Sequence, residues 1–239
     1  DVTDKYSCIG LFGPKSRKFL TELFGNYFSN EDFVFSRGKY LTIENSKIWF
    51  QRLSFVGELG WEIYIPVKKT NVIFKKINKM GKKYNLVYAG MHALDTLRLE
   101  KKFLHWGHDI TSENNPFESG LSFAVSFKKK EDFIGRKSLE KIRDKPLKNK
   151  LELFSLKKNF IPGAPLLLYD EPIYQKDKVV GYTTSSNYSF CYKKNICLGY
   201  VKGEIQDKEN LSVEVEGKRY SLKLEKTPLH DPTSRLMRS

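Results

Sequence analysis

Residues 57–64, GELGWEIY, hold two glycines around a glutamate and then a run that is typical of a β-strand. Successive side chains of a strand point to opposite faces, so Trp61 and Ile63 share one face while Glu62 and Tyr64 share the other. A carboxylate and a phenol on one rigid strand can clamp a planar heterocycle, because the carboxylate accepts two N–H groups and the ring stacks. The same pattern also fits an ordinary solvated strand face, and this segment alone leaves both interpretations open.

On both sides of this strand the sequence predicts a mixture of strands and helices. Apolar runs predict strands, and apolar residues at helical spacing predict helices. Pro14 suits the first turn of a helix that Gly25 ends, and the residues 44–46 suit a hairpin turn. The strands are expected at 9–12, 38–43, 47–53, 61–67 and 123–127, and the helices at 15–24, 70–81, 91–104 and from 135 onward.

Beyond a charged linker at 143–150 the pattern changes to short strands. Turns with Gly, Asn or Pro separate them and no convincing helix interrupts them, which favours a small antiparallel barrel or sandwich. These strands are expected at 151–156, 164–169, 179–184, 196–201, 211–215 and 219–224. We therefore predict an α+β domain over residues 1–148, followed by a small antiparallel β-barrel domain over residues 149–239.

The composition is that of a folded chain without membrane spans. Of the 239 residues, 40% are hydrophobic and 29% are charged, which excludes a disordered chain. No apolar run approaches the roughly 20 residues that cross a bilayer. Cys8, Cys191 and Cys197 form no spaced framework, so we expect a reducing compartment, the cytoplasm or, in a eukaryote, the mitochondrial matrix. Because the chain begins without Met or a signal pattern, we expect it to be cut from a longer protein.

The formal net charge of +14, from 42 Lys and Arg against 28 Asp and Glu, favours an anionic partner. Most of these basic residues are Lys and they are scattered, whereas base-reading and bidentate phosphate sites rely on Arg. A Lys-rich solvated surface explains the same charge, so we do not predict a nucleic-acid partner.

Familiar catalytic and metal-binding motifs are absent from the sequence. There is no Gly-rich phosphate loop and no paired-Cys zinc motif. His105, His108 and Asp109 lack the helical context and the further ligands of a metal site, so no metal is predicted. Cys8 would need a lowered pKa and a neighbouring base to act as a nucleophile, and we interpret it as a buried structural cysteine.

Several segments resemble a known family and follow one another in that family's order. Residues 57–64 resemble the Gly-Glu-x-Gly-aromatic-Glu-hydrophobic signature of the glycine-cleavage T-protein (aminomethyltransferase) family, and residues 89–101, which contain ALDTLRLEK, resemble its central helix. The segments that resemble its later loops and its C-terminal barrel are 106–109, 115–121, 132–136, 180–185, 198–201 and 228–232. The resemblance implies a T-protein-like folate-binding domain, incomplete at its N-terminus, followed by the barrel.

Details of these motifs indicate a subtype. The LEK at 99–101, the WG at 106–107 and the PLHDP at 228–232 are most similar to the C-terminal folate module of dimethylglycine and sarcosine dehydrogenases. In those enzymes a FAD domain oxidises an N-methylamine, and the module passes the one-carbon unit to tetrahydrofolate, which gives 5,10-methylenetetrahydrofolate. The resemblance therefore implies a tetrahydrofolate-dependent module of one-carbon transfer, with its FAD domain upstream of this chain. Its partners would be folate and a small N-methylamine-derived one-carbon unit, with no nucleic acid and no membrane.

The resemblance also implies roles for individual residues. Glu62 corresponds to the carboxylate that binds the pterin ring, and Glu58, Tyr64 and Trp106 are further candidates for cofactor contacts. A pterin presents an amino group and a ring N–H, two adjacent donors that suit a carboxylate. The family's catalytic Asp lies in a segment upstream of this chain. No catalytic residue is therefore assigned, and the chain alone is expected to be poorly active.

The chain departs from the family's pattern at two positions. Leu94 stands where the aminomethyltransferases have Arg, and His230 stands where the tail motif has Tyr. Asp1 and Asp4 do not match the upstream catalytic Asp. An alternative function is a non-catalytic folate-binding scaffold of the same fold, acting in RNA modification or iron–sulfur repair, in which the barrel and the Lys-rich surface contact a macromolecule.

Overall fold

The computed structural model describes residues 1–159, 166–205, 208 and 210–239. These residues form two compact units. One unit comprises Asp1–Leu94 and His230–Ser239, and the other comprises Asp95–Leu229. The domain boundary predicted near residue 148 lies inside the second unit, and that boundary stays a prediction.

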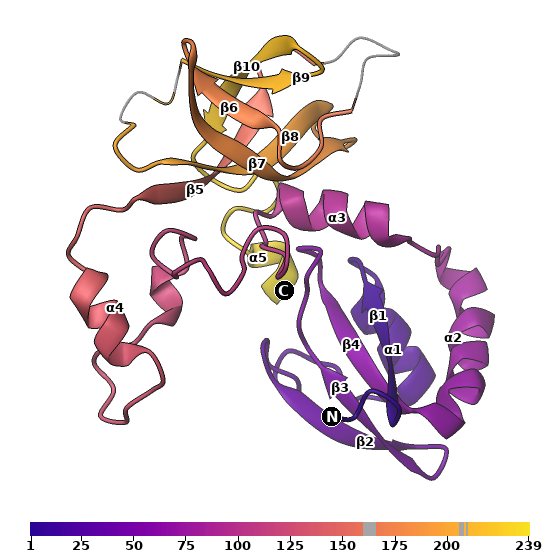
Figure 1. Cartoon of the computed structure of the whole chain (residues 1–239). Helices are drawn as coiled ribbons and strands as arrows, with labels where there is room; N and C mark the ends of the chain where they lie inside the picture. Colours follow the sequence, from indigo (N-terminus) through magenta and orange to yellow (C-terminus); the bar gives the residue numbers. More distant parts are fainter. Residues whose placement is uncertain (160–165, 206–207, 209) are drawn as a thin grey trace. The chain divides into compact units, whose positions relative to one another are not determined.

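The first unit is built on a four-stranded antiparallel sheet in the order β1-β4-β3-β2 (Figure 1). Its strands are β1 (Tyr6–Phe12), β2 (Gly38–Ile43), β3 (Ser46–Gln51) and β4 (Gly60–Pro66). The β2–β3 hairpin turns at Glu44 and Asn45, whose φ angles of 52° and 56° are those of a tight turn that suits the strand twist. The four strands predicted in this part of the chain are confirmed, and β4 lies between β1 and β3.

Two helices cover one face of this sheet. Helix α1 (Ser16–Phe24) and helix α2 (Thr70–Tyr84), which follows the short 3-10 helix η1 (Val67–Lys69), contact each other and β4 (Figure 1). On the covered face, the completely buried Trp61 packs edge-on against Phe28, with 5.6 Å between the ring centroids. Because edge-to-face aromatic contacts add to the burial of apolar surface, this core fixes which face of β4 turns inward.

The C-terminal residues belong to the first unit and are anchored there by a buried arginine. Arg52 is only 1% exposed, and its Nη2 donates to the carbonyl oxygens of Arg238 at 2.8 Å and Ser239 at 2.7 Å. Its Nη1 donates to the carbonyl oxygen of Phe33 at 2.7 Å. Burial lowers the pKa of Arg52 to about 10, because it disfavours the charged form. The tail contains a short helix, α5 (Arg235–Arg238), which the sequence did not predict.

Helix α3 (Met91–Glu100) spans the boundary between the two units and is shorter than predicted. The predicted helix extends to residue 104, but Lys102 takes a left-handed backbone conformation with a φ of 57°. Such a conformation ends a helix, because it cannot continue the right-handed turn. Helix α4 (Arg136–Ile142) agrees with the helix predicted from residue 135.

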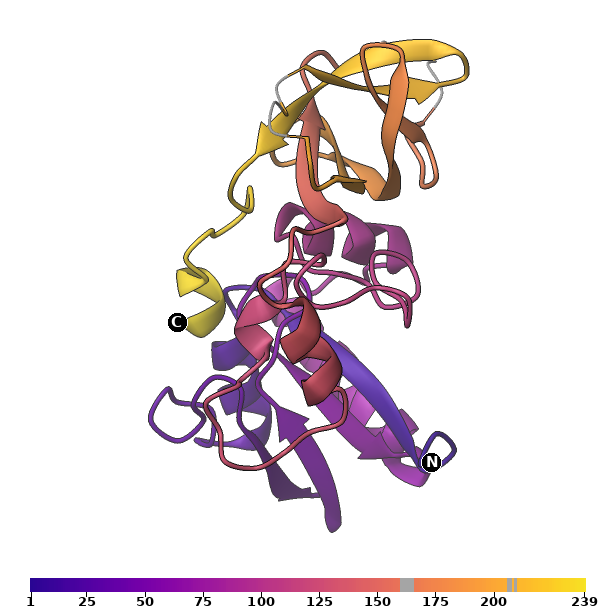
Figure 2. The ribbon, with the colours of Figure 1, turned by 60° about the vertical axis from the view of Figure 1, so that its left-hand side comes forward.

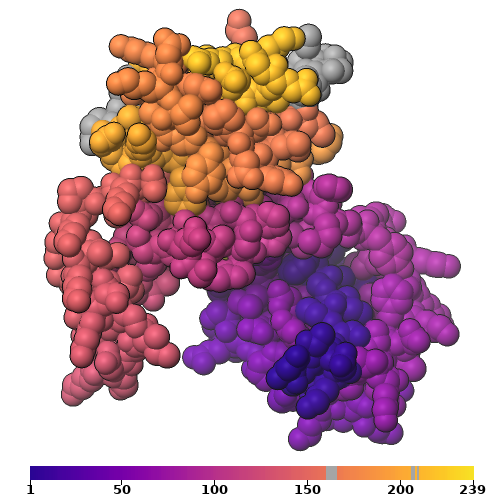
Figure 3. All heavy atoms as spheres, in the orientation of Figure 1, coloured from indigo at the N-terminus to yellow at the C-terminus, as the bar shows by residue number. Residues whose placement is uncertain are grey.

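The strand predicted at 123–127 is wrong. This part of the chain contains the 3-10 helix η2 (Ser122–Ala124), in which the Ala124 N–H donates to the carbonyl oxygen of Leu121. Phe123 is 85% exposed, so the alternation that suggested a strand does not bury an apolar face. From there to α4 the chain, coloured coral in Figures 1 and 3, projects from the rest of the second unit.

The barrel of the second unit closes in the order β10-β5-β8-β7-β6-β9, with antiparallel pairing throughout (Figures 1 and 2). Its strands are β5 (Asn149–Leu156), β6 (Pro172–Gln175), β7 (Lys178–Ser189), β8 (Lys194–Lys202), β9 (Leu211–Val215) and β10 (Lys218–Glu225). One apolar cluster includes Phe154 and Val213, and a second joins Leu99 of α3 to Leu153 of β5. The small antiparallel barrel predicted from the sequence is confirmed.

One barrel strand lies at a different place from the predicted one. The strand predicted at 164–169 begins outside the described residues, and its described part, 166–169, is not in a strand. Leu167 is buried in the barrel core between the exposed Leu166 and Leu168, but this run is not part of a β-strand. The barrel uses β6 instead, which begins only after Asp170 has turned the chain with a φ of 61°.

Candidate functional site

Glu62 and Tyr64 lie on the face of the four-stranded sheet that is opposite the core of the first unit, and we call this the polar face. Their neighbours along β4, Trp61, Ile63 and Ile65, are completely buried on the other face. The side chains of Glu62 and Tyr64 are partly exposed. The alternation predicted for this strand is therefore confirmed.

The two polar side chains of β4 contact each other. Tyr64 Oη donates a hydrogen bond of 2.7 Å to Glu62 Oε2. This bond favours the neutral phenol, and together with burial and the negative charge of Glu62 it raises the pKa of Tyr64 well above its ordinary value. The second carboxylate oxygen, Oε1, has no hydrogen-bond partner in the described part of the chain. Tyr64 thus holds the Glu62 carboxylate in place, and this carboxylate can still accept hydrogen bonds from a ligand.

An aromatic ring lies beside Glu62 because two glycines leave room for it. Gly10 of β1 is paired with Glu62, and Gly60 of β4 is paired with Phe12. A Cβ at Gly60 would lie 2.2 Å from Phe12 Cδ1, and one at Gly10 would lie 2.4 Å from Phe12 Cε2. Any other residue at either position would displace the ring, so the glycines place the Phe12 side chain against the polar face.

The neighbouring strands contribute further polar and aromatic groups that the sequence analysis missed. On β3, Gln51 is paired with Glu62 and Trp49 with Tyr64. Trp49 Nε1 donates to Gln51 Oε1 at 3.4 Å, and the Trp49 ring lies 4.9 Å from that of Tyr40 on β2. The signal was present in the sequence, because the predicted hairpin fixes the register and the alternation then places these residues on one face.

Cys8 lies opposite Tyr64 in the register between β1 and β4. It is exposed, so the interpretation of Cys8 as a buried structural cysteine is wrong: β1 is an edge strand, and Cys8 belongs to its polar side. Partial desolvation of the thiol and the negative charge of Glu62 raise its pKa, and the hydrogen bond with Tyr64 opposes them. Because a raised pKa disfavours the thiolate, we do not assign Cys8 as a nucleophile.

Glu58 contacts the C-terminal tail. His230 Nε2 lies 2.8 Å from Glu58 Oε1, which is an ion-pair distance when the imidazole is protonated. The two atoms are close without the alignment of a hydrogen bond, since the buried Nε2 has no hydrogen-bond partner among the described residues. The carboxylate of Glu58, in the loop before β4, is thus turned to the histidine that stands where the T-protein motif has Tyr.

Trp106, the fourth predicted cofactor contact, lies in the second unit and is 67% exposed. It forms an isolated bridge with Ile110, across a turn in which Gly107 has a φ of 90°. The structure therefore brings Glu62 and Tyr64 into contact, turns Glu58 toward His230, and presents Trp106 from an exposed turn of the other unit.

Next to this turn a buried ion pair joins the end of α3 to the barrel. Arg98 and Asp109, 3% and 0% exposed, form an ion pair, and Arg98 Nη2 also donates to Ser185 Oγ at 2.7 Å. Thr184 Oγ1 donates to Asp109 Oδ1 at 2.6 Å. Asp109, considered above as a metal ligand with the two histidines, is thus a partner of Arg98. Among the described residues no group of three or more His, Cys, Asp or Glu is arranged to hold a metal ion.

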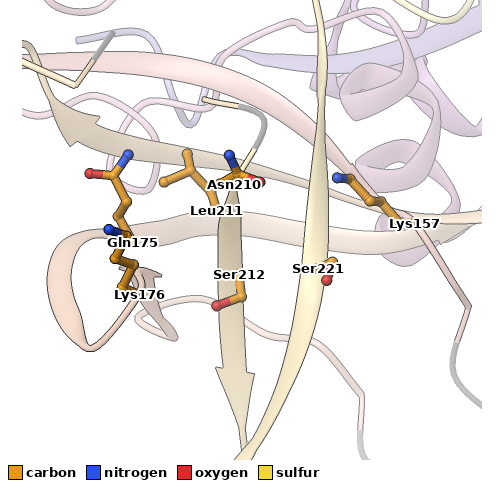
Figure 4. A pocket seen from close by; sticks show the side chains of 7 residues that line it. All are labelled: Lys157, Gln175, Lys176, Asn210, Leu211, Ser212 and Ser221. Carbon is orange, nitrogen blue, oxygen red and sulfur yellow. The ribbon is translucent and has the colours of Figure 1, made fainter. Parts of the chain in front are cut away.

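A cavity of about 640 Å³ lies on the wall of the barrel (Figure 4). Ser212 of β9 and Ser221 of β10 are paired side by side, with Lys157 on one flank and Gln175 on the other. The described residues of its lining carry hydroxyl, amide and ammonium groups, and none of them carries a carboxylate or an imidazole. None of the predicted cofactor residues lines it, so the polar face remains the candidate site. Within the described ranges every helix is too short or too polar to cross a membrane.

Comparisons with known proteins match both parts of the chain. The family model described as the GCVT N-terminal domain matches residues 1–129, and the one described as the glycine cleavage T-protein C-terminal barrel domain matches residues 153–231. The mitochondrial dimethylglycine dehydrogenase of Rattus norvegicus is 32% identical over 230 residues, which are 96% of this chain and 26% of that protein. The aminomethyltransferase of Halothermothrix orenii is 33% identical over 201 residues, 84% of this chain and 54% of that protein.

A solved structure has the same fold. The glycine cleavage system aminomethyltransferase T from Bartonella henselae superposes with a TM-score of 0.81 over 95% of this chain and 60% of that one, at 20% sequence identity. At this identity the likeness concerns the fold alone. The chain spans about a quarter of the length of the dimethylglycine dehydrogenase that it matches.

Proposed function

This chain belongs to the glycine-cleavage T-protein family, and from that premise we propose that it binds tetrahydrofolate on the polar face and serves in one-carbon transfer. The observation that supports this most is the contact between Tyr64 and Glu62, which holds a partly exposed carboxylate on the central part of a rigid sheet. The family resemblance drawn from the sequence motifs is confirmed, whereas the ligand and the reaction are our proposals.

The groups on the polar face suit a pterin ring. A pterin offers an amino group and a ring N–H side by side, and a carboxylate accepts both in charge-assisted hydrogen bonds. Glu62 has this capacity at Oε1 and at the remaining lone pair of Oε2, because Tyr64 uses only one acceptor position. Phe12 lies next to Glu62, and Trp49 lies across Gln51 from it, so a flat ligand would meet aromatic surface beside the carboxylate.

Glu62 rather than Glu58 is proposed as the pterin ligand. The Glu58 carboxylate lies 2.8 Å from His230 and belongs to a loop, whereas Glu62 is fixed by strand pairing on both sides. Tyr64 would act as a positioning residue, since its hydroxyl fixes the orientation of the carboxylate plane. Trp106 belongs to the second unit, and its role as a cofactor contact stays a prediction from the sequence resemblance.

When bound, tetrahydrofolate supplies the nucleophilic nitrogen that captures a one-carbon unit at the oxidation level of formaldehyde. The residues of this chain orient the cofactor through Glu62 and keep water from it with the aromatic side chains, so positioning is their main contribution to the rate. We propose that the one-carbon unit comes from an N-methylamine oxidised by a FAD-dependent domain of the dimethylglycine or sarcosine dehydrogenase type, and that the product is 5,10-methylenetetrahydrofolate.

Calorimetric titration with 5-formyltetrahydrofolate, a stable folate, tests the proposed ligand. The matched control is p-aminobenzoylglutamate, which keeps the anionic tail and lacks the pterin. We expect saturable binding of the folate and binding of the control that is weaker by at least about tenfold, because the pterin makes the contacts with Glu62. Equal binding of the two compounds would mean that the positive surface merely attracts anions, and absence of folate binding would refute the proposal.

A further inference from the structure

A separate cluster of charges lies in the second unit and shares no residue with the polar face. Glu152 of β5 is a buried carboxylate, 7% exposed. Three ammonium groups surround it. Lys208 Nζ lies 2.6 Å and Lys150 Nζ 3.0 Å from its Oε1, and Lys102 Nζ lies 3.7 Å from its Oε2.

Within the described part of the chain, the positive charge of this cluster exceeds the negative charge paired with it. Glu152 is the only carboxylate that pairs with any of the three lysines among the residues that the structure describes. The side chains of Lys208 and Lys102 are only 13% and 28% exposed, so water screens their mutual repulsion poorly. Burial and the neighbouring ammonium groups lower the pKa of Lys102, although Glu152 opposes them. An additional negative charge would relieve this repulsion.

A cavity of about 860 Å³ has one residue of the cluster, Lys150, in its lining. Its lining includes Lys150 together with Lys148 and Lys202, and one carboxylate, that of Glu204. A further carboxylate nearby, Glu118, accepts the backbone N–H groups of Lys148 and Asn149 and so already has partners. Among the described residues, lysines therefore outnumber carboxylates both in the cluster and in the lining of the cavity that shares Lys150 with it.

We propose that the Lys102–Lys150–Lys208 cluster binds a doubly charged oxyanion, a phosphate or a dicarboxylate, in addition to Glu152. The charge of such an anion matches the excess of two positive charges over the one carboxylate that the described residues pair with these lysines. Lysine ammonium groups each carry three donors, and the contact with Glu152 leaves donors of Lys102 and Lys150 for oxygen atoms of the anion. This site is independent of the proposed folate site, because no residue of the polar face takes part in it.

The site is tested by calorimetric titration with inorganic phosphate and, separately, with glutarate, both at constant ionic strength. We expect saturable binding of at least one of them, and the tighter of the two identifies the oxyanion. Lys102→Met should weaken this binding about tenfold, since a charge-assisted contact is lost, whereas Lys218→Met, which removes an exposed lysine of β10, should leave it unchanged.

The Glu152→Gln variant should change the affinity for phosphate in the opposite direction to Lys102→Met. Removing the competing carboxylate should tighten phosphate binding several-fold, while the melting temperature without phosphate should fall because the lysines lose their counter-charge. Equal affinities in the wild type, Lys102→Met and Lys218→Met would overturn the proposal, as would stabilisation by phosphate that sodium chloride reproduces at the same ionic strength. Folate binding should be unchanged in Lys102→Met, so failure of this site is distinguishable from failure of the proposed function.

Discussion

Replacing Glu62 by glutamine should weaken folate binding far more than the same replacement at Glu58. The glutamine would keep the size of the side chain and could still accept the hydrogen bond from Tyr64 through its amide oxygen. Its NH₂ group would then face the donors of the pterin, and two donors cannot form a hydrogen bond. The variant thus removes the ligand contact with little change to the strand.

The magnitude follows from the kind of contact that is lost. A hydrogen bond to a charged group contributes about 1.5–3 kcal/mol, and the partly exposed position of Glu62 favours the lower half of this range. Every 1.4 kcal/mol or so corresponds to a tenfold change in affinity. We therefore expect Kd for 5-formyltetrahydrofolate to rise about ten- to fortyfold.

The assay is calorimetric titration of the wild type and of both variants under one buffer condition. Glu58→Gln is the matched control, because its carboxylate contacts His230 and is not proposed to contact the ligand. It should change Kd less than about threefold and should lower the melting temperature slightly. Equal losses in the two variants, or an unchanged Kd in Glu62→Gln, would place the pterin contact elsewhere.

Three further predictions concern the packing at Gly60, the buried ion pair of the second unit and the contact between Tyr64 and Glu62. Gly60→Ala should destabilise the protein by about 1–3 kcal/mol in urea denaturation, because the new Cβ would lie 2.2 Å from the Phe12 ring and 2.6 Å from the carbonyl oxygen of Leu11; an unchanged midpoint would show that the ring is not held there. Asp109→Asn should cost about 3 kcal/mol by the same assay, since it removes the buried counter-charge of Arg98 and leaves only the partly exposed Asp95, 3.3 Å from Arg98 Nε; a loss below 1 kcal/mol or so would contradict the buried pair. The raised pKa of Tyr64 implies stability that is fully present below about pH 10 and is lost as the pH rises further; an ultraviolet titration of tyrosinate should show this pKa falling in Glu62→Gln, and a pKa that does not move would refute the contact.

The strands of the polar face could be predicted because their signal is local. Alternation along β4 separates Trp61 and Ile63 from Glu62 and Tyr64, and burial in the structure follows this division. The same argument, applied to the predicted hairpin, would have added Trp49 and Gln51 to the predicted residues of the polar face. These were missed because neither residue type by itself suggests a ligand contact.

Other features depend on contacts between distant parts of the chain. Nothing near Glu58 in the sequence indicates that its partner is His230, because the tail must first return to the first unit. Similarly, the sequence around Arg52 gives no sign that the Arg52 guanidinium donates to the carbonyl oxygens of Arg238 and Ser239.

The wrong and displaced strands have a common cause. The runs at 123–127 and 164–169 have apolar residues in a strand-like pattern, but Phe123 is exposed and residues 166–169 are not in a strand, although Leu167 is buried. A strand needs a partner and a buried face, and the local pattern specifies neither. The strand that the barrel uses, β6, is only four residues long and begins with proline, so its local signal is weak.

The most direct test of the polar face uses the protein's three tryptophans, Trp49, Trp61 and Trp106, as reporters. Their indole ¹H–¹⁵N resonances can be assigned with single Trp→Phe variants and followed during titration with 5-formyltetrahydrofolate. Trp49 lies on the polar face with its Nε1 bonded to Gln51, the residue opposite Glu62, whereas Trp61 is buried on the other side of the sheet. We predict a saturable shift of the Trp49 resonance, with the Kd found by calorimetry, and a much smaller shift of the Trp61 resonance. Saturable folate binding that leaves the Trp49 resonance unmoved would contradict the assignment of the pterin site to this face.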